Sequence, residues 1–217
     1  MRRGSAQRVG NYNEAGSHLS QATLGGGELA PLATMNSYRV RLATAADAEA
    51  IARIYNQGIE DRVATLETEL RTPEERRRWL AGRSPRHPVI VAEVTEPAGT
   101  SGRPRSERAG PEAPATIVGW GSLNAFNPRE AYRFVADFSV YVEREYRGKG
   151  VGRVMLERLI ELAREHGFHK MVLSAFPTNT GGMALYEKLG FRTVGIYREQ
   201  GQLDGKWLDT IIMEKLL

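Results

Sequence analysis

The spacing of apolar residues predicts strands that alternate with helices from Tyr38 to the end of the chain. Runs in which every second residue is apolar are typical of half-buried strands, whereas apolar residues at every third or fourth position are typical of helices. Strands are expected over residues 38–42, 88–94, 116–126, 134–143, 171–176, 193–198 and 207–214. Helices are expected after Thr44, after Thr72, and over residues 151–165 and 182–189. This alternation indicates an α+β or α/β-like domain built on one mixed sheet.

Two of the helices have clear start signals. Thr44 can cap a helix together with Asp47, three residues further on. The sequence TPEE at residues 72–75 combines a capping threonine, a proline at the first helical position and a carboxylate at the third. The helix that starts there is expected to run through Trp79.

The predicted strands also suggest how the sheet is built. Segments 88–94 and 116–126 are rich in β-forming residues and follow one another, so we expect them to pair as a hairpin. The strand at 134–143 alternates in polarity and has two distinct faces. One face is expected to carry Phe134, Ala136, Phe138, Val140 and Val142, and the other Arg133, Val135, Asp137, Ser139 and Tyr141.

Residues 1–36 and 95–115 have no apolar periodicity. The first segment is rich in Gly, Ser, Ala and Asn, and is expected to be a disordered leader. The second contains three Glu and three Arg, and is expected to be a flexible loop inserted between two strands. The folded domain is therefore expected to cover residues 37–217.

The composition narrows the possible chemistry. The 217 residues include no cysteine, which excludes disulfides, thiolate metal ligands and a cysteine acyl-enzyme. The net charge is +4, but the charges alternate in sign instead of forming a basic stripe, so nucleic acid is not an expected partner. No apolar run is long enough to span a membrane, and no apolar segment follows the basic first residues. A cytoplasmic location without membrane contact is therefore expected.

The sequence RGKGVG at residues 147–152 lies between a predicted strand and a predicted helix. Three alternate glycines let the backbone curl so that successive amides point inward, and the helix N-terminus adds partial positive charge. Arg147 and Lys149 add full charges, so the loop predicts a site for a pyrophosphate group. Taken alone, such a loop can also be a tight turn into a helix.

Two common nucleotide-binding loops do not match this sequence. A Walker-A loop has Lys and Ser or Thr after its last glycines, but Arg153 follows Gly152 here. A Rossmann loop has the spacing GxGxxG and an acidic residue about 20 residues later. The spacing here is GxGxG, and the later strand offers Val172, Leu173 and Ser174.

The loop and a second motif resemble the GNAT superfamily of N-acetyltransferases. Residues 147–152 fit the family's acetyl-CoA loop, Q/R-x-x-G-x-G/A, and residues 137–142 are similar to its central strand. The sequence NTGGMALYEKLGF at 179–191 resembles a motif whose Asn contacts the pantetheine arm and whose Tyr faces the thioester sulfur. The resemblance implies a mostly antiparallel sheet flanked by helices, and acetyl-CoA as cosubstrate without a metal. The implied cofactor-binding residues are Val140, Tyr141, Val142, Arg147, Gly148, Lys149, Gly150, Val151, Gly152 and Asn179.

Other segments resemble phosphinothricin N-acetyltransferases and, most closely, their arsinothricin-resistance relatives. These segments are residues 54–59, 72–75, 131–132 and 205–209. The similarity covers about residues 38–217 but not the loop at 95–115. It implies a homodimer that transfers an acetyl group to the α-amine of a small amino-acid-like substrate, such as phosphinothricin or arsinothricin.

Asp137 and Tyr186 are the expected catalytic residues. Without a cysteine, the simplest chemistry is direct attack of the amine on the thioester in a ternary complex. Asp137 is expected to take the proton of the amine through water or directly; it is one methylene shorter than the family's usual Glu. Tyr186 is expected to protonate the departing thiolate, and a backbone amide near Val140 to meet the oxyanion. Asp137 can instead pair only with an arginine, and Tyr186 can be a packed aromatic.

Arg129, Tyr132 and Arg133 are the expected substrate-binding residues. Arginine recognises oxyanions through two parallel hydrogen bonds, and the substrate analogues carry two anionic groups. An Arg also stands at the position of Arg129 in the phosphinothricin enzymes, although each arginine can be an ordinary solvated residue. His166 and His169 lie three apart, but no carboxylate cluster completes a ligand set, so no metal is expected.

Two other functions are compatible with these residues. One is acetylation of another amine, such as an amino acid, a polyamine or a protein N-terminus, because the pocket and not the fold decides the substrate. The other is a non-catalytic CoA-binding module that keeps the loop and has lost turnover.

Overall fold

The computed structural model describes residues 38–94 and 115–217. The leader predicted for 1–36 and the loop predicted for 95–115, apart from Ala115, lie outside the described residues. Within these two ranges, no helix is long and apolar enough to cross a membrane.

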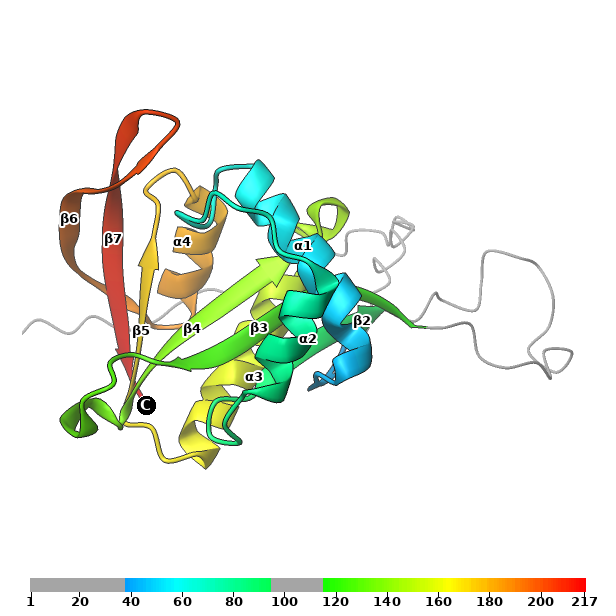
Figure 1. Ribbon diagram of the computed structural model, residues 1–217. Coiled ribbons are helices and arrows are strands. Elements are labelled where there is room, and N and C mark those ends of the chain that lie inside the picture. The colour runs from blue at the N-terminus through cyan, green and yellow to red at the C-terminus, as the bar shows by residue number, and fades with distance from the viewer. Residues whose placement is uncertain (1–37, 95–114) are drawn as a thin grey trace, which may run out of the picture. The chain divides into compact units, whose positions relative to one another are not determined.

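The described residues form strands and helices close to those predicted (Figure 1). The strands are β1 (Tyr38–Leu42), β2 (Val89–Val94), β3 (Thr116–Ala125), β4 (Val135–Val142), β5 (Lys170–Ala175), β6 (Arg192–Leu203) and β7 (Lys206–Leu216). The α-helices are α1 (Ala48–Glu60), α2 (Pro73–Ala81), α3 (Val151–Glu165) and α4 (Thr180–Lys188).

The strands form one mixed sheet in the order β1-β2-β3-β4-β5-β7-β6. Neighbouring strands run antiparallel except for β4 and β5, which are parallel. The predicted α+β fold with a mixed, mostly antiparallel sheet is therefore confirmed. The antiparallel pairing of β2 with β3 also confirms the predicted hairpin.

The two parallel strands separate soon after they begin. Their pairing covers only Val135–Asp137 of β4, which lie opposite Lys170–Val172 of β5. Figure 1 shows β4 and β5 diverging from this point toward their C-terminal ends. Beyond Asp137, β4 is paired on its β3 side and not with β5. This separation opens the sheet beside the predicted active-site residues.

Helices cover both faces of the sheet (Figure 1). On one face, Met155 and Leu159 of α3 are fully buried against the central strands. On the other face, Ile51 and Ile54 of α1 pack with Trp120 of β3, and α2 lies beside them. The alternation of apolar residues along the strands thus supplies two separate cores.

Both predicted capping boxes are present, although one of them precedes a 3-10 turn and not an α-helix. At α2, Thr72 and Glu75 exchange hydrogen bonds between side chain and backbone, as a capping box requires. The pair of Thr44 and Asp47 forms the same box, but it precedes a single 3-10 turn, and α1 begins only at Ala48.

Phe134 is a correction to the predicted central strand. The alternation predicts it on the same strand face as Ala136 and Phe138, but it lies just before β4 and, unlike them, is exposed. Its ring is covered instead by the guanidinium groups of Arg86 and Arg133, at 5.6 and 4.3 Å. The alternation pattern therefore predicted the start of the strand one residue too early. It counted Phe134 as a residue of the strand, whereas cation–π contacts stabilise this aromatic ring in an exposed position.

Two other boundaries differ for local reasons. α4 begins at Thr180, before the predicted residue 182, because the side chain of Asn179 accepts a hydrogen bond from the amide of Gly182 and caps the helix. β6 continues to Leu203, past the predicted end at residue 198, through an irregularity between Tyr197 and Gly201.

Truncating the α3 core should destabilise the fold strongly. Leu159→Ala is expected to lower the free energy of unfolding by about 2–5 kcal/mol, because the side chain is fully buried and leaves a cavity. Chemical denaturation measures this change. Leu216→Ala is the matched control, because Leu216 is 64% exposed and should change stability by no more than about 0.5 kcal/mol. Equal losses in the two variants would contradict this account of the core.

Candidate active site

The glycine loop leads directly into α3 and leaves its backbone amides open. Gly148 and Gly150 have φ values of 74° and 91°, which residues other than glycine rarely adopt. A Cβ atom at either position would meet nothing within 4 Å, so open space lies beside the backbone. Within the described residues, the amides of Gly148, Gly150, Val151 and Gly152 have no hydrogen-bond acceptor. The loop is therefore built to accept an anion.

Arg147 is held beside the loop by an acidic residue at the end of α1. Its Nη1 lies 2.6 Å from Oδ2 of Asp61, and its Nε donates to the carbonyl of Val142 at 3.2 Å. Asp61 also pairs with Arg144 at 2.7 Å. Hydrogen bonds from Arg144 and Arg147 keep the pKa of Asp61 below its ordinary value.

A pocket of about 390 Å³ lies against the loop, and we call it the loop pocket. The predicted cofactor-binding residues that line it are Val140, Tyr141, Val142, Arg147, Gly148, Gly150, Gly152 and Asn179. Lys149 and Val151 do not line it: the Lys149 ammonium lies over the ring of Tyr146, and the Val151 side chain is buried in the core. No carboxylate is among the described residues that line the loop pocket.

A second pocket of about 170 Å³ lies where β4 and β5 separate, and we call it the splay pocket. It contains both predicted catalytic residues, Asp137 and Tyr186, together with Ser139, Leu173 and Ser174. The residues that line both pockets are Ala64, Val140, Tyr141, Asn179 and Tyr186. The two pockets therefore meet along these residues, and Tyr186 belongs to both.

The protonation of both catalytic candidates is set by burial. Burial raises the pKa of Asp137 to about 6, although its carboxylate accepts a hydrogen bond from the amide of Phe138 at 2.7 Å. Burial also raises the pKa of Tyr186 above its ordinary value. At neutral pH, Asp137 is thus a carboxylate that binds a proton readily, and Tyr186 is a neutral phenol that can donate one.

Arg129, Tyr132 and Arg133 are not brought to these pockets. They line a separate pocket of about 170 Å³ at the N-terminal end of β4, and it shares no lining residue with the loop pocket or the splay pocket. Arg133 pairs with Glu130 at 2.9 Å, and Tyr132 packs against Phe126 at 5.6 Å between ring centroids. Because β4 carries the glycine loop at its other end, residues that precede it lie away from the loop.

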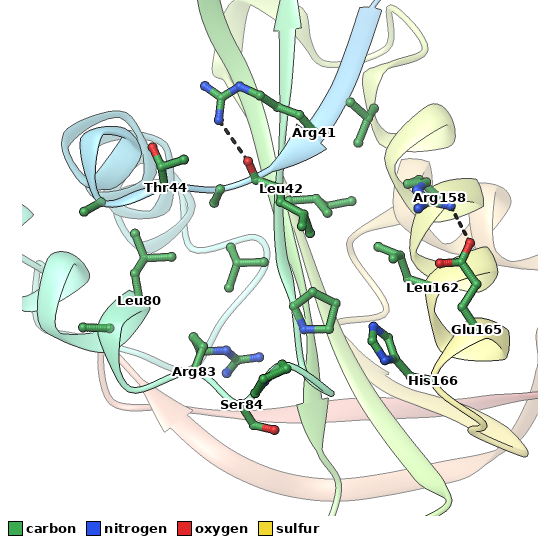
Figure 2. A pocket seen from close by; sticks show the side chains of 18 of the residues that line it. Arg41, Leu42, Thr44, Leu80, Arg83, Ser84, Arg158, Leu162, Glu165 and His166 are labelled. Atoms are coloured by element: carbon green, nitrogen blue, oxygen red, sulfur yellow. Dashed lines mark hydrogen bonds and ion pairs between the residues drawn. The ribbon is translucent and has the colours of Figure 1, made fainter.

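The largest pocket, of about 730 Å³, lies at the edge of the sheet near β1 and the C-terminal ends of α2 and α3. Figure 2 shows Arg41, Arg83, Arg158 and His166 around it. Arg41 pairs with Asp47 and Glu93, and Arg158 with Glu161 and Glu165. Most of its positive charge is therefore already neutralised, and none of the predicted catalytic residues lines it.

Among the described residues, no group of three or more His, Asp or Glu side chains could hold a metal ion. His166 lines the large pocket at the end of α3, and His169 precedes β5 with its backbone amide bonded to the carbonyl of Phe134. The two histidines therefore lie in different environments.

Sequence patterns missed several residues that shape the site. Asp61 and Ala64 lie in the segment between α1 and α2, for which the sequence predicted no element and which is far from the glycine loop in sequence. Leu173 and Ser174 lie on β5, whose buried pattern indicated a strand but not its separation from β4. No local signal in the sequence could have identified them.

Comparisons with known proteins agree with this geometry. Residues 56–191 match the Acetyltransferase (GNAT) family. An L-methionine sulfoximine/L-methionine sulfone acetyltransferase of Pseudomonas paraeruginosa is 31% identical over 179 residues, which are 82% of this chain and 94% of the relative.

Two solved structures are similar in fold and sequence. A ribosomal-protein-alanine N-acetyltransferase from Brucella melitensis is 34% identical, with a TM-score of 0.70 over 82% of this chain and 99% of that one. A phosphinothricin acetyltransferase from Sinorhizobium meliloti, solved in complex with AcCoA, is 29% identical, with a TM-score of 0.67 over 83% and 88%. With a family match over more than half of its length, this chain belongs to the GNAT family of acetyltransferases.

Proposed function

We propose that this protein transfers an acetyl group from acetyl-CoA to the α-amine of a small amino-acid-like substrate such as phosphinothricin or arsinothricin. The observation that carries the proposal is the meeting of the two pockets along shared residues that include Tyr186. One pocket offers open amides for the anionic part of a cofactor, and the other offers a buried carboxylate for an amine.

The hydrogen-bonding groups of the loop pocket suit coenzyme A. The free amides of Gly148, Gly150, Val151 and Gly152 suit a diphosphate. The β4 edge at Val140–Val142, which β5 does not pair, can hydrogen-bond an extended amide-containing arm. Acetyl-CoA supplies the acetyl group as a thioester whose carbonyl carbon an amine can attack. The relative from Sinorhizobium meliloti was solved with AcCoA, which supports the same cofactor here.

Asp137 and Tyr186 supply the proton transfers. Asp137 accepts a proton from the ammonium form of the substrate, directly or through one water, because its pKa of about 6 makes it a better base than an exposed carboxylate. Tyr186 donates its phenolic proton to the departing sulfur, and its phenolate regains a proton from the nitrogen, which loses its second proton as the amide forms. Since the chain has no cysteine, we expect direct attack in a ternary complex and no covalent intermediate.

The names of the relatives support an amino-acid-like substrate. Phosphinothricin, methionine sulfoximine and methionine sulfone occur in the names of two of them. A protein N-terminus is the second candidate, because the solved structure at 34% identity is titled a ribosomal-protein-alanine N-acetyltransferase. The substrate role of Arg129, Tyr132 and Arg133 stays a prediction, and their separate pocket favours another anchor for the substrate.

A homodimer also remains part of the proposal. Large apolar side chains of the β6–β7 hairpin are about half exposed, and exposed apolar surface is typical of interaction sites. They are Val194, Ile196, Tyr197 and Trp207.

The glycine loop can be tested with two matched glycines. Gly150→Ala is expected to raise the Kd for acetyl-CoA at least about tenfold, because alanine disfavours the backbone conformation that presents the amides. Gly167→Ala is the control: Gly167 also has a positive φ, of 69°, and open space at Cβ, but lies at the far end of α3. Calorimetric titration measures both affinities. If the two variants bind equally well, the loop is not the anion site.

The pH dependence of the rate tests Asp137 as the base. Because a protonated carboxyl group cannot accept the substrate proton, kcat/KM should fall about tenfold per pH unit below about pH 6. Asp137→Asn should lower the rate by about 100- to 10,000-fold and remove this limb of the profile. A thiol-release assay with acetyl-CoA and a panel of amines measures both. An unchanged profile in the variant would assign the base to another group.

The burial that raises the pKa of Asp137 should also lower the stability of the folded protein at neutral pH. Its pKa lies about two units above the ordinary value of 3.8, so the folded state binds a proton more tightly than the unfolded state. The stability of the wild type should therefore fall as the pH rises from about 4 to 6. The free energy of unfolding of Asp137→Asn should exceed that of the wild type by up to about 3 kcal/mol at pH 7.5. Near pH 3.5 the two should be equally stable. Denaturant titrations at both pH values check this, and a destabilised variant at pH 7.5 would contradict it.

A further inference from the structure

A series of hydrogen bonds crosses the sheet from Arg83 to the splay pocket. Nη2 of Arg83, in the segment between α2 and β2, donates to the carbonyl of Leu123 and, at 3.2 Å, to Oδ1 of Asn124. The hydroxyl of Ser122 donates to the same Oδ1 at 3.0 Å. Nδ2 of Asn124 in turn donates to Oγ of Ser139 at 3.3 Å. We call these contacts the Arg83–Asn124–Ser139 network.

The arginine determines the direction of every bond in this network. A guanidinium group carries only donors, so the Asn124 atom beside it has to be the carbonyl oxygen. The amide nitrogen of Asn124 therefore faces Ser139, whose oxygen accepts the bond. Ser139 is left with its own proton to donate, and among the described residues its hydroxyl donates no hydrogen bond.

The hydroxyl group of Ser139, whose proton is not donated, lies in the splay pocket. Ser139 lines that pocket together with Asp137, and the two alternate positions lie on the same face of β4. The register places Asn124 opposite Asp137, and Ser122 opposite Ser139, so the network lies on the sheet beside the pocket. The carboxylate of Asp137 accepts from the amide of Phe138. A donor and an acceptor thus stand side by side in the pocket.

The network begins at a positive charge that no acid neutralises. No carboxylate lies within 4 Å of the Arg83 guanidinium among the described residues. In contrast, two other arginines that line the same pocket of about 730 Å³ are paired: Arg41 with Asp47, and Arg158 with Glu165 (Figure 2 shows the second pair). Arg83 donates instead to the carbonyl of His87, at 3.0 Å, and lies over the ring of Trp79. Hydrogen bonds in series polarise one another, so this charge makes Ser139 a stronger donor.

We propose that Ser139 binds the carboxylate of an α-amino acid whose amine lies against Asp137, and that Asn124 and Arg83 are positioning residues for its hydroxyl. An α-amino acid carries its amine and its carboxylate on one carbon, which matches an acceptor and a donor at alternate positions of one strand. The inference rests on the proposed function and names its specificity-determining residue. It also supplies the carboxylate contact that Arg129 and Arg133 do not reach from their separate pocket.

The test compares two acceptors that differ only in the carboxylate. One is L-methionine sulfone, and the other is the same amine with hydrogen in place of the carboxyl group. Ser139→Ala is expected to lower kcat/KM for the amino acid by about 10- to 100-fold, mainly through KM, because one hydrogen bond to a charged group is lost. Turnover of the amine that lacks the carboxylate should stay within about twofold of wild type.

Three further measurements separate positioning from structural effects. Ser139→Thr keeps a hydroxyl and should retain most of the preference for the amino acid. Asn124→Ala and Arg83→Gln leave Ser139 in place and should lose part of the preference, about three- to tenfold. The midpoint of the acidic limb of the pH profile should not move in Ser139→Ala, because the hydroxyl serves the substrate and not Asp137.

The outcomes distinguish this inference from the function on which it rests. Equal losses on both acceptors, or a shifted pH midpoint in Ser139→Ala, would overturn the role of Ser139 while acetyl transfer stands. A wild-type enzyme that acetylates the amine as well as the amino acid would do the same. If the wild type releases no thiol with any amine, the proposed function fails first, and this inference fails with it.

Discussion

The early separation of β4 from β5 is the constraint on which the rest of the site depends. Parallel pairing stops at Asp137, so the C-terminal half of β4 has one edge without a neighbouring strand. An unpaired edge next to a core is normally a liability in a sheet, because its amides and carbonyls seek partners. Here the gap contains the splay pocket and leads to the loop pocket. Asp137 lies at the point where the strands part, which explains why it is buried enough to be a better base.

The parts of the fold that depend on local chemistry could be predicted from the sequence. Alternation along β4, the capping box at Thr72 and the glycine spacing at residues 147–152 each involve neighbours a few positions apart. They act through short-range sterics and hydrogen bonds, which a single sequence displays. The structure places Asp137 and Tyr186 in the lining of one pocket, and their catalytic roles, which rest on the resemblance between motifs, stay a prediction.

The parts that depend on distant segments could not be predicted. Arg129 and Arg133 are close to Asp137 in sequence, yet a strand extends by about 3.3 Å per residue, and they occupy another pocket at the beginning of β4. In contrast, Asp61 contacts Arg147, and Arg83 contacts Asn124, across separations that no pattern displays. Proximity along the chain is therefore a poor guide to which charged residues meet in the folded protein.

The pairing of Asp61 has a consequence for how an anion reaches the glycine loop. Arg144 and Arg147 both contact Asp61, and Arg144 also contacts Glu60, so two cations and two anions lie together at this corner. Interactions over distances beyond the Debye length of about 8 Å are largely screened, and within that distance the opposite charges of this corner nearly cancel. The amide dipoles act only at contact. Capture of a ligand at this corner is thus governed by diffusion and close fit, and its rate should depend only weakly on ionic strength.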